Sequence, residues 1–222
     1  MQWPFLTRMT AAIVDFYRGD TAGALETMGV VLREQPAKTW ADCLPQTNLC
    51  AMHAWSGSEG TARGLAATVM KHVARAEKAN LMGQWSAALV AADTLALLGD
   101  KPACASLYPA ARAFAELGHR FDTTSFGPTT PILSAANAAA AGGHADLARE
   151  HFEQALDLAE SAPSRIHQSI VRFWFGRHLS SSSDADARAR GTAMLVEAVD
   201  RFRSMGMITH QQHAERALRA ER

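Results

Sequence analysis

One turn residue followed by three packing residues at fixed offsets recurs along this chain. Gly19 is followed by Ala24, Met28 and Val31, at offsets of 5, 9 and 12 residues. Steps of four and three residues return to the same face of an α-helix, so each copy marks a helix that follows its turn. The other copies are Gly99 with Cys104, Tyr108 and Ala111; Gly143 with Ala148, Phe152 and Ala155; Gly60 with Leu65, Val69 and His72; and Asp186 with Gly191, Leu195 and Ala198.

The spacing of these copies limits the fold class. Successive turns are separated by 41, 39, 44 and 43 residues, which is longer than the roughly 34 residues of a tetratricopeptide (TPR) repeat. The order of a small, a bulky and a small residue is that of a TPR second helix, whose small residues let it lie close to its partner helix. The sequence therefore predicts an all-α fold, a TPR-like solenoid of helical hairpins in an open-ended row.

Glycine and proline breakers divide the chain into segments of helix length. Strand-like Val/Ile runs are absent, and alanine, a strong helix former, is abundant. Pro45 makes a continuous helix through Cys43 and Cys50 doubtful, and the stretch that begins at Ser180 is expected to be a polar loop. We predict one domain over 1–222, with helix pairs over 5–35, 40–79, 84–117, 128–161 and 164–204 and a terminal helix over 207–221.

Charge and hydropathy argue against two classes of partner. Lys+Arg and Asp+Glu both number 22, so no net field draws the chain to nucleic acid or to an anionic membrane. No stretch approaches the roughly 20 apolar residues of a membrane span. The first twenty residues lack the pattern of a signal peptide. We expect a cytoplasmic protein that makes no direct contact with nucleic acid or membrane.

The three cysteines show neither CxxC nor paired spacing. We interpret Cys43, Cys50 and Cys104 as small buried packing residues, with a disulfide or a metal site as the alternative.

The nine histidines raise the question of metal or acid–base chemistry. His210 and His213 are three residues apart, but two ligands alone hold a metal weakly, and no HExxH motif is present. His72 and His151 fall on apolar stripes, where packed, hydrogen-bonded histidines are usual. The sequence also lacks the GxSxG nucleophile motif. We expect no catalytic residue, cofactor or metal in this chain, and therefore no enzyme activity.

Aromatic residues mark the one candidate contact surface. Phe173, Trp174 and Phe175 are consecutive and project about 100° apart on a helix, so they do not share one face. One interpretation places a groove for a peptide or ligand here, contacted by Arg172, Phe173, Trp174 and Arg177; the other buries all three aromatics between helix pairs. Four other tryptophans are expected to be core or interface anchors: Trp3, Trp40, Trp55 and Trp85.

Three longer stretches carry a family resemblance. They are LALLGDKPACASLYPAARAFAELGHR, FGPTTPILSAANAAAAGGHADLAREHFEQALDLAE and VRFWFGRHLSSSSDADARARGTAMLVEAVDRFRSMGM. From about Ala88 to Met207, roughly half of the chain, the sequence resembles the C-terminal TPR-like region of large bacterial signalling ATPases. These proteins often carry a nucleotidyl cyclase domain or a LuxR-type DNA-binding helix-turn-helix.

The resemblance implies a role in bacterial signal transduction or transcription regulation. The phosphate-binding motif GxxxxGK[ST] is absent, so any ATPase or cyclase activity would reside in domains outside this chain. The implied function is a non-catalytic regulatory scaffold that binds a protein partner or other domains of the same assembly. The alternative is a sensor that binds a small-molecule effector in its concave groove.

The N-terminal pair gives a further expectation. If a preceding repeat is missing, Trp3, Phe5, Ile13 and Phe16 should be exposed, and the chain would self-associate through this uncapped edge.

Overall fold

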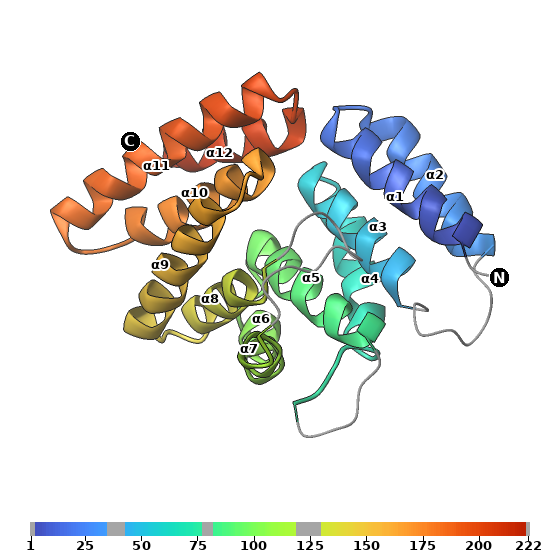
Figure 1. Ribbon diagram of the computed structural model, residues 1–222, viewed down its shortest axis with the longest axis horizontal. Helices are drawn as coiled ribbons and strands as arrows, with labels where there is room; N and C mark the ends of the chain where they lie inside the picture. Colours follow the sequence, from blue (N-terminus) through green and yellow to red (C-terminus); the bar gives the residue numbers. More distant parts are fainter. Residues whose placement is uncertain (1–2, 35–42, 77–81, 119–129, 221–222) are drawn as a thin grey trace.

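The computed structural model describes residues 3–34, 43–76, 82–118 and 130–220, and every regular element within these ranges is a helix. The prediction of an all-α fold is confirmed. Short turns join the two helices of each hairpin, and the hairpins pack side by side (Figure 1). Within the same ranges, no helix combines the length and the apolar character that crossing a bilayer requires.

The N-terminal half contains two hairpins and a third, broken one. Their helices are α1 (Trp3–Tyr17), α2 (Thr21–Glu34), α3 (Leu44–Trp55), α4 (Glu59–Val69), α5 (Met82–Leu98), α6 (Lys101–Ala105) and α7 (Tyr108–Glu116). The C-terminal half consists of α8 (Pro131–Ala141), α9 (Ala145–Ser161), α10 (Arg165–Ser180), α11 (Ala185–Ser204) and α12 (Ile208–Ala220).

The turn glycines of the repeat adopt the left-handed backbone conformation. Gly19, Gly99 and Gly143 have φ of +93°, +71° and +79°, a region that glycine occupies without steric cost. Each lies two residues before the next helix. The residues that define the repeat point into the core after these turns: Ala24, Met28, Cys104, Ala148, Phe152, Ala155, Leu195 and Ala198 are buried, and Tyr108 is half-buried.

Two of the five predicted turn positions are wrong. Gly60 lies inside α4, and the left-handed glycine of this hairpin is Gly57. Counted from Gly57, the same offsets of 5, 9 and 12 reach Ala62, Ala66 and Val69, all buried. Asp186 lies in the first turn of α11 rather than in the preceding turn, because Asp184 caps this helix and starts it one turn earlier than the repeat requires.

Local backbone chemistry explains three further differences. The second helix of the third pair is broken between α6 and α7 because Pro109, in the first turn of α7, cannot continue a helix. Pro45 lies in the first turn of α3, where proline is tolerated, so Cys50 is helical and Cys43 is the N-cap. The polar run at Ser180 forms only a short turn, since α10 ends at Ser180 and α11 begins at Ala185.

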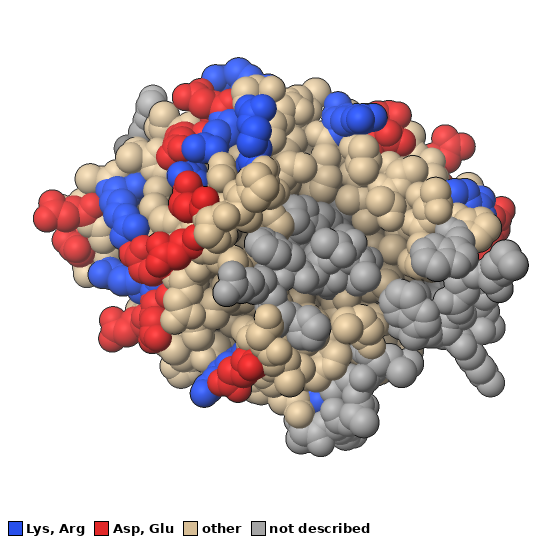
Figure 2. All heavy atoms as spheres, in the orientation of Figure 1, with Lys and Arg blue, Asp and Glu red and all other residues tan. Residues whose placement is uncertain are grey.

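The helices divide into an inner and an outer set. Side chains from α1, α3, α5, α8, α10 and α12 line one central cavity, and the remaining helices pack around them. The inner helix α5 is buried on all sides, whereas α9 buries one face and exposes the other. On the face shown in Figure 2, basic and acidic side chains are interspersed, most densely over the C-terminal helices at the left.

The first and last hairpins meet, so the prediction of an open-ended row is wrong. A Cβ added to Gly19 would lie 3.2 Å from the Gly206 carbonyl oxygen and 3.2 Å from Cδ1 of Ile208. The rings of Phe16 and His210 are 6.1 Å apart, and α12 also packs on α3. Stacked hairpins rotate by a small angle at each step, and here the turn between α1 and α2 comes to lie beside the turn between α11 and α12 (Figure 1).

The first helix buries its apolar side chains mainly against its own neighbours α2 and α3. Phe5, Ile13 and Phe16 are buried, so their expected exposure is wrong and the predicted route to self-association loses its basis. The side chain of Trp3 lies outside the described residues, as does Trp40.

The tightest contact between two helices joins α10 to α11. A Cβ on Gly191 would lie 2.6 Å from the backbone nitrogen of Ser180 and 2.8 Å from the carbonyl oxygen of Gly176. Both distances are shorter than any normal van der Waals contact, so glycine at position 191 is what allows these two backbones to touch.

Candidate functional site

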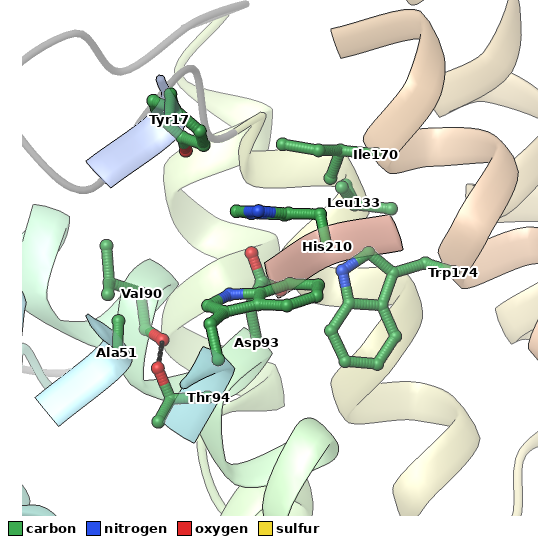
Figure 3. A pocket seen from close by; sticks show the side chains of 10 residues that line it. Tyr17, Ala51, Val90, Asp93, Thr94, Leu133, Ile170, Trp174 and His210 are labelled. Carbon is green, nitrogen blue, oxygen red and sulfur yellow. Dashed lines mark hydrogen bonds between the residues drawn. The ribbon is translucent and has the colours of Figure 1, made fainter. Parts of the chain in front are cut away.

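A small cavity lies where the inner helices converge (Figure 3). It offers about 30 Å³ to the centres of water molecules, which is room for about two of them. Its walls are mainly apolar and aromatic, with one carboxylate and one imidazole. The lining residues are Tyr17, Ala51, Trp55, Val90, Asp93, Thr94, Leu133, Ile170, Trp174 and His210.

Asp93 is the carboxylate of this cavity. It lies on α5 and accepts hydrogen bonds from Asn137 Nδ2 at 2.8 Å and from Ser134 Oγ at 3.3 Å, both on α8. Burial raises its pKa to about 7, although these two donors act in the opposite direction. Sequence reasoning missed Asp93, yet it is the only charged residue of the largely apolar α5, and that contrast was a usable signal.

Aromatic rings form the other walls. Trp55 from α3 stacks on His210 from α12 with ring centroids 4.1 Å apart, and it meets Trp174 from α10 edge-on at 6.3 Å. Tyr17 from α1 lies 5.2 Å from His210, and burial raises the Tyr17 pKa. The cavity therefore joins residues that are distant in the sequence.

The two histidines of α12, His210 and His213, both contact other helices. His213 donates from Nε2 to the Trp55 carbonyl oxygen at 3.0 Å, and His210 lies fully buried. Burial lowers the pKa of His210 to about 3 and that of His213 to about 4, so both are neutral at pH 7. Across the described ranges, no three His, Cys, Asp or Glu side chains gather in a way that would hold a metal ion.

Two polar atoms at the cavity have no hydrogen-bond partner among the described residues. They are Nε1 of Trp174 and Nε2 of His210, and both are buried. A buried polar group without a partner is destabilising by about 1–3 kcal/mol, so a water molecule or a ligand group in the cavity would satisfy them.

A second, more open depression lies next to this cavity and shares part of its wall. This groove has a volume of about 300 Å³ and lies at the C-terminal ends of α5, α8 and α10. Asn137 and Trp174 belong both to the groove and to the wall of the cavity, Asn137 through its bond to Asp93. The polar and aromatic residues that line the groove are Lys101, Asn137, Phe152, Trp174, Arg177, His178 and Ser181.

Arg177 is the distinctive group of the groove. Its guanidinium lies over the rings of Phe173 and Trp174, 5.4 and 5.0 Å from their centroids. Its Nη1 is buried without a hydrogen-bond partner within the part of the chain that the structure describes, and burial lowers its pKa. No Asp or Glu is among the residues that line the groove, so the charge of Arg177 has no counter-ion there.

Only two of the four predicted groove residues line this groove. Trp174 and Arg177 do, but Arg172 and Phe173 do not. Arg172 lies on another side of α10, where it forms ion pairs with Glu160 on α9 and Glu197 on α11. Its role is therefore to tie three helices together.

The aromatic run in α10 is buried throughout. Phe173, Trp174 and Phe175 are 1%, 4% and 0% exposed, as in the second interpretation of the sequence. All three can be buried because neighbours cover every side of the helix: Phe152 stacks on Phe175 at 5.3 Å, and Trp55 meets Phe173 at 5.4 Å. Trp174 still reaches both the cavity and the groove.

The cysteines are free and buried, as the packing interpretation requires. Cys43, Cys50 and Cys104 donate to the carbonyl oxygens of Gly83, Ala62 and Ala92. Burial raises the pKa of the Cys50 and Cys104 thiols to about 12, so neither is a thiolate nucleophile at neutral pH.

The two histidines predicted to pack have different outcomes. His151 is buried, and its Nε2 lies 3.1 Å from the Tyr108 hydroxyl. His72 is exposed, so that prediction is wrong, because α4 ends at Val69 and the stripe does not continue to position 72. Of the predicted tryptophan anchors, Trp55 is buried and Trp85 is half-buried against Phe114.

No protein-family model, curated protein or solved structure matches this chain. Arguments about its function therefore rest on the cavity and the groove themselves.

Proposed function

We propose that this chain is a non-catalytic regulatory scaffold that binds an acidic segment of a partner protein, or of another domain of the same assembly, in the groove beside Trp174 and Arg177. The observation that carries the proposal is the guanidinium of Arg177, which is largely buried and has no counter-ion among the residues that line the groove. Buried charges in proteins are normally paired, and a carboxylate is the planar partner that arginine binds best.

The shape and chemistry of the groove support this proposal. Its volume of about 300 Å³ lies at the lower end of the range of binding pockets. Lys101 adds a second positive charge at its edge, and Trp174 adds an aromatic surface. Tryptophan and arginine are the residue types that contribute most to protein interfaces.

The repeat pattern adds context. TPR-like hairpins present grooves to partner segments, and the resemblance to the C-terminal region of bacterial signalling ATPases implies regulation rather than catalysis. Such a scaffold would act within signal transduction or transcription regulation in the bacterial cytoplasm.

The test is a peptide-binding titration with Arg177→Gln. We expect short peptides rich in Asp and Glu to bind the full chain more tightly than neutral or Lys-rich peptides of the same length. Loss of one charge-assisted contact of about 1.5–3 kcal/mol should weaken binding about tenfold or more.

Arg33→Gln is the matched control, since Arg33 is an exposed arginine in the last turn of α2. It should change the affinity less than twofold. Equal binding of acidic and basic peptides, or equal losses in the two variants, would contradict the proposal.

The alternative function, a small-molecule sensor, is favoured by a separate observation. Nε1 of Trp174 and Nε2 of His210 are buried at the cavity without partners in the described residues. A ligand that satisfied them would stabilise the fold. Thermal unfolding against a panel of metabolites tests this: a rise in Tm of several degrees at ligand concentrations far above Kd is expected for a sensor, and no shift with any compound counts against it.

A further inference from the structure

We infer that the central cavity is a binding site for a small primary-ammonium cation, with the Asp93 carboxylate as its counter-ion. The inference rests on the second proposed function, effector sensing, and names the class of effector. It does not depend on binding of an acidic segment in the groove.

The first support is the charge balance of the cavity. Asp93 is the one carboxylate among the ten lining residues, and none of these is Lys or Arg. Its two hydrogen bonds come from a neutral amide, Asn137, and a neutral hydroxyl, Ser134. A partly buried carboxylate among apolar walls and without a positive partner is destabilising in its ionised form, and a bound monovalent cation would neutralise it.

The second support is the nature of the walls. Tyr17, Trp55 and Trp174 line the cavity together with Asp93, and Figure 3 shows Tyr17 and Trp174 among the residues of its wall. The faces of aromatic rings carry partial negative charge and attract cations, most strongly where water is excluded. A carboxylate combined with indole and phenol rings is therefore suited to an ammonium group.

The third support is size. The available volume of about 30 Å³ admits about two water-sized groups, which matches ammonium or methylammonium. A tetramethylammonium ion is too large. His210 is neutral at pH 7 because burial lowers its pKa to about 3, so its unpaired Nε2 adds no repulsive charge.

Protons compete with the cation for Asp93. The pKa of Asp93 is raised to about 7 by burial, so below pH 7 the carboxyl group is increasingly neutral and the affinity for a cation should fall about tenfold per pH unit.

The other groups that face Asp93 keep one charge state across this range. Tyr17 from α1 has a raised pKa, and the Cys104 thiol from α6 has a pKa of about 12, so both stay protonated. His210 from α12 stays neutral, while α3, α8 and α10 present the non-titrating side chains of Trp55, Asn137, Ser134 and Trp174.

The experiment compares thermal unfolding of the full chain in methylammonium, tetramethylammonium and sodium chlorides at equal ionic strength. At pH 8 we expect saturating methylammonium to raise Tm by about 5 °C or more relative to sodium. The tetramethylammonium salt should act like sodium. At pH 5.5 the difference should largely vanish.

Asp93→Asn is the deciding variant, because it removes the charge while its amide oxygen can still accept from Asn137 and its amide nitrogen can donate to the Ser134 hydroxyl oxygen. We expect this variant to fold and to lose the methylammonium shift while keeping its affinity for acidic peptides. An isothermal titration with methylammonium should show heat of binding for the natural chain alone.

The inference is overturned if methylammonium and sodium give the same Tm at pH 8, or if Asp93→Asn keeps the shift. If acidic peptides also fail to bind, the groove proposal fails separately, because Arg177 and not Asp93 carries that interaction.

Discussion

At the scale of single residues, Asp93 makes the stability of this protein depend on pH. The apolar helix α5 places it at the central cavity, where only neutral donors reach it. Its pKa of about 7 lies above the value of 3.8 for a free aspartate. The folded state therefore holds its proton more tightly than the unfolded chain does, and stability from this group is lost as pH rises from about 4 to about 7.

Replacing Asp93 by Asn removes this dependence. We expect Asp93→Asn to be more stable than the natural chain at pH 8, by about 2–4 kcal/mol, and nearly equal to it at pH 4. Denaturant unfolding at the two pH values measures the difference. Asp157→Asn, which changes an exposed aspartate on α9, is the control and should behave like the natural chain at both.

His210 changes the stability with pH in the opposite direction to Asp93. Burial lowers its pKa from 6.5 to about 3, so its contribution is complete above pH 6.5 and is lost as pH falls toward 3. His210→Phe keeps the ring that stacks on Trp55 and should resist acid better, with a smaller drop in denaturation midpoint between pH 7 and pH 4.5. A variant that loses stability at pH 4.5 as steeply as the natural chain would exclude His210 as the cause.

At the scale of helices, the pair α10 and α11 is the most tightly constrained. The backbones approach at Gly176 and Gly191, where a single added carbon has no room. The ion pairs of Arg172 with Glu160 and Glu197 add α9 to the same unit.

Two glycine-to-alanine substitutions should therefore change the stability of the fold in opposite directions. Gly191→Ala should destabilise the fold by about 1–3 kcal/mol or more, because it forces α10 and α11 apart. Gly64→Ala lies in α4 with open space around it and should stabilise by about 0.5–1 kcal/mol, since alanine favours helix. Chemical unfolding measures the stability of both variants relative to the natural chain. A change in the same direction for both would refute the close-contact explanation.

Sequence patterns predict most of these helices because their signals are local. Gly19, Gly99 and Gly143 identify three turns correctly, since a left-handed turn and the stripe after it lie within twelve residues. The pattern predicts a turn at Gly60 rather than at Gly57 because apolar residues follow both glycines at similar spacing. Pro109 splits a helix that the stripe alone would make continuous.

The candidate site was predictable only in part. Trp174 and Arg177 are visible as an aromatic and basic cluster in the sequence, and they do line the groove. The partners of Asp93 lie on α8, more than forty positions away, and no local pattern indicates which helices will pack against α5.

At the scale of the whole molecule, closure between the first and last hairpins is the main feature that sequence reasoning missed. Tyr17 and His210 are in contact although nearly the whole chain separates them. The closure depends on the small rotation between successive hairpins, which is set by packing at every interface.

This closure predicts that the two ends unfold together. Phe16→Ala removes a fully buried ring of α1 that contacts His210 and should be destabilising by about 3–5 kcal/mol. Hydrogen exchange should then speed up in α1, α2 and α12 together.

Phe114→Ala is the matched change, since Phe114 is a buried phenylalanine on α7 that stacks on Trp85 of α5. It should speed exchange in α5, α7 and α8 while leaving α12 protected. If hydrogen exchange in the Phe16→Ala variant speeds up in α1 but not in α12, the contact between the first and last hairpins contributes little to stability.

The shared wall of Asn137 and Trp174 has a thermodynamic consequence. Asn137 faces the groove while its amide donates to the carboxylate behind it. Suppose that protonation of Asp93 changes the affinity of a molecule in the groove by some factor. Thermodynamic linkage then requires that binding of this molecule change the proton affinity of Asp93 by the same factor. Binding of a molecule in the groove would then be accompanied by uptake or release of a proton at Asp93. The amount of proton exchanged would increase with the strength of the coupling between the groove and Asp93.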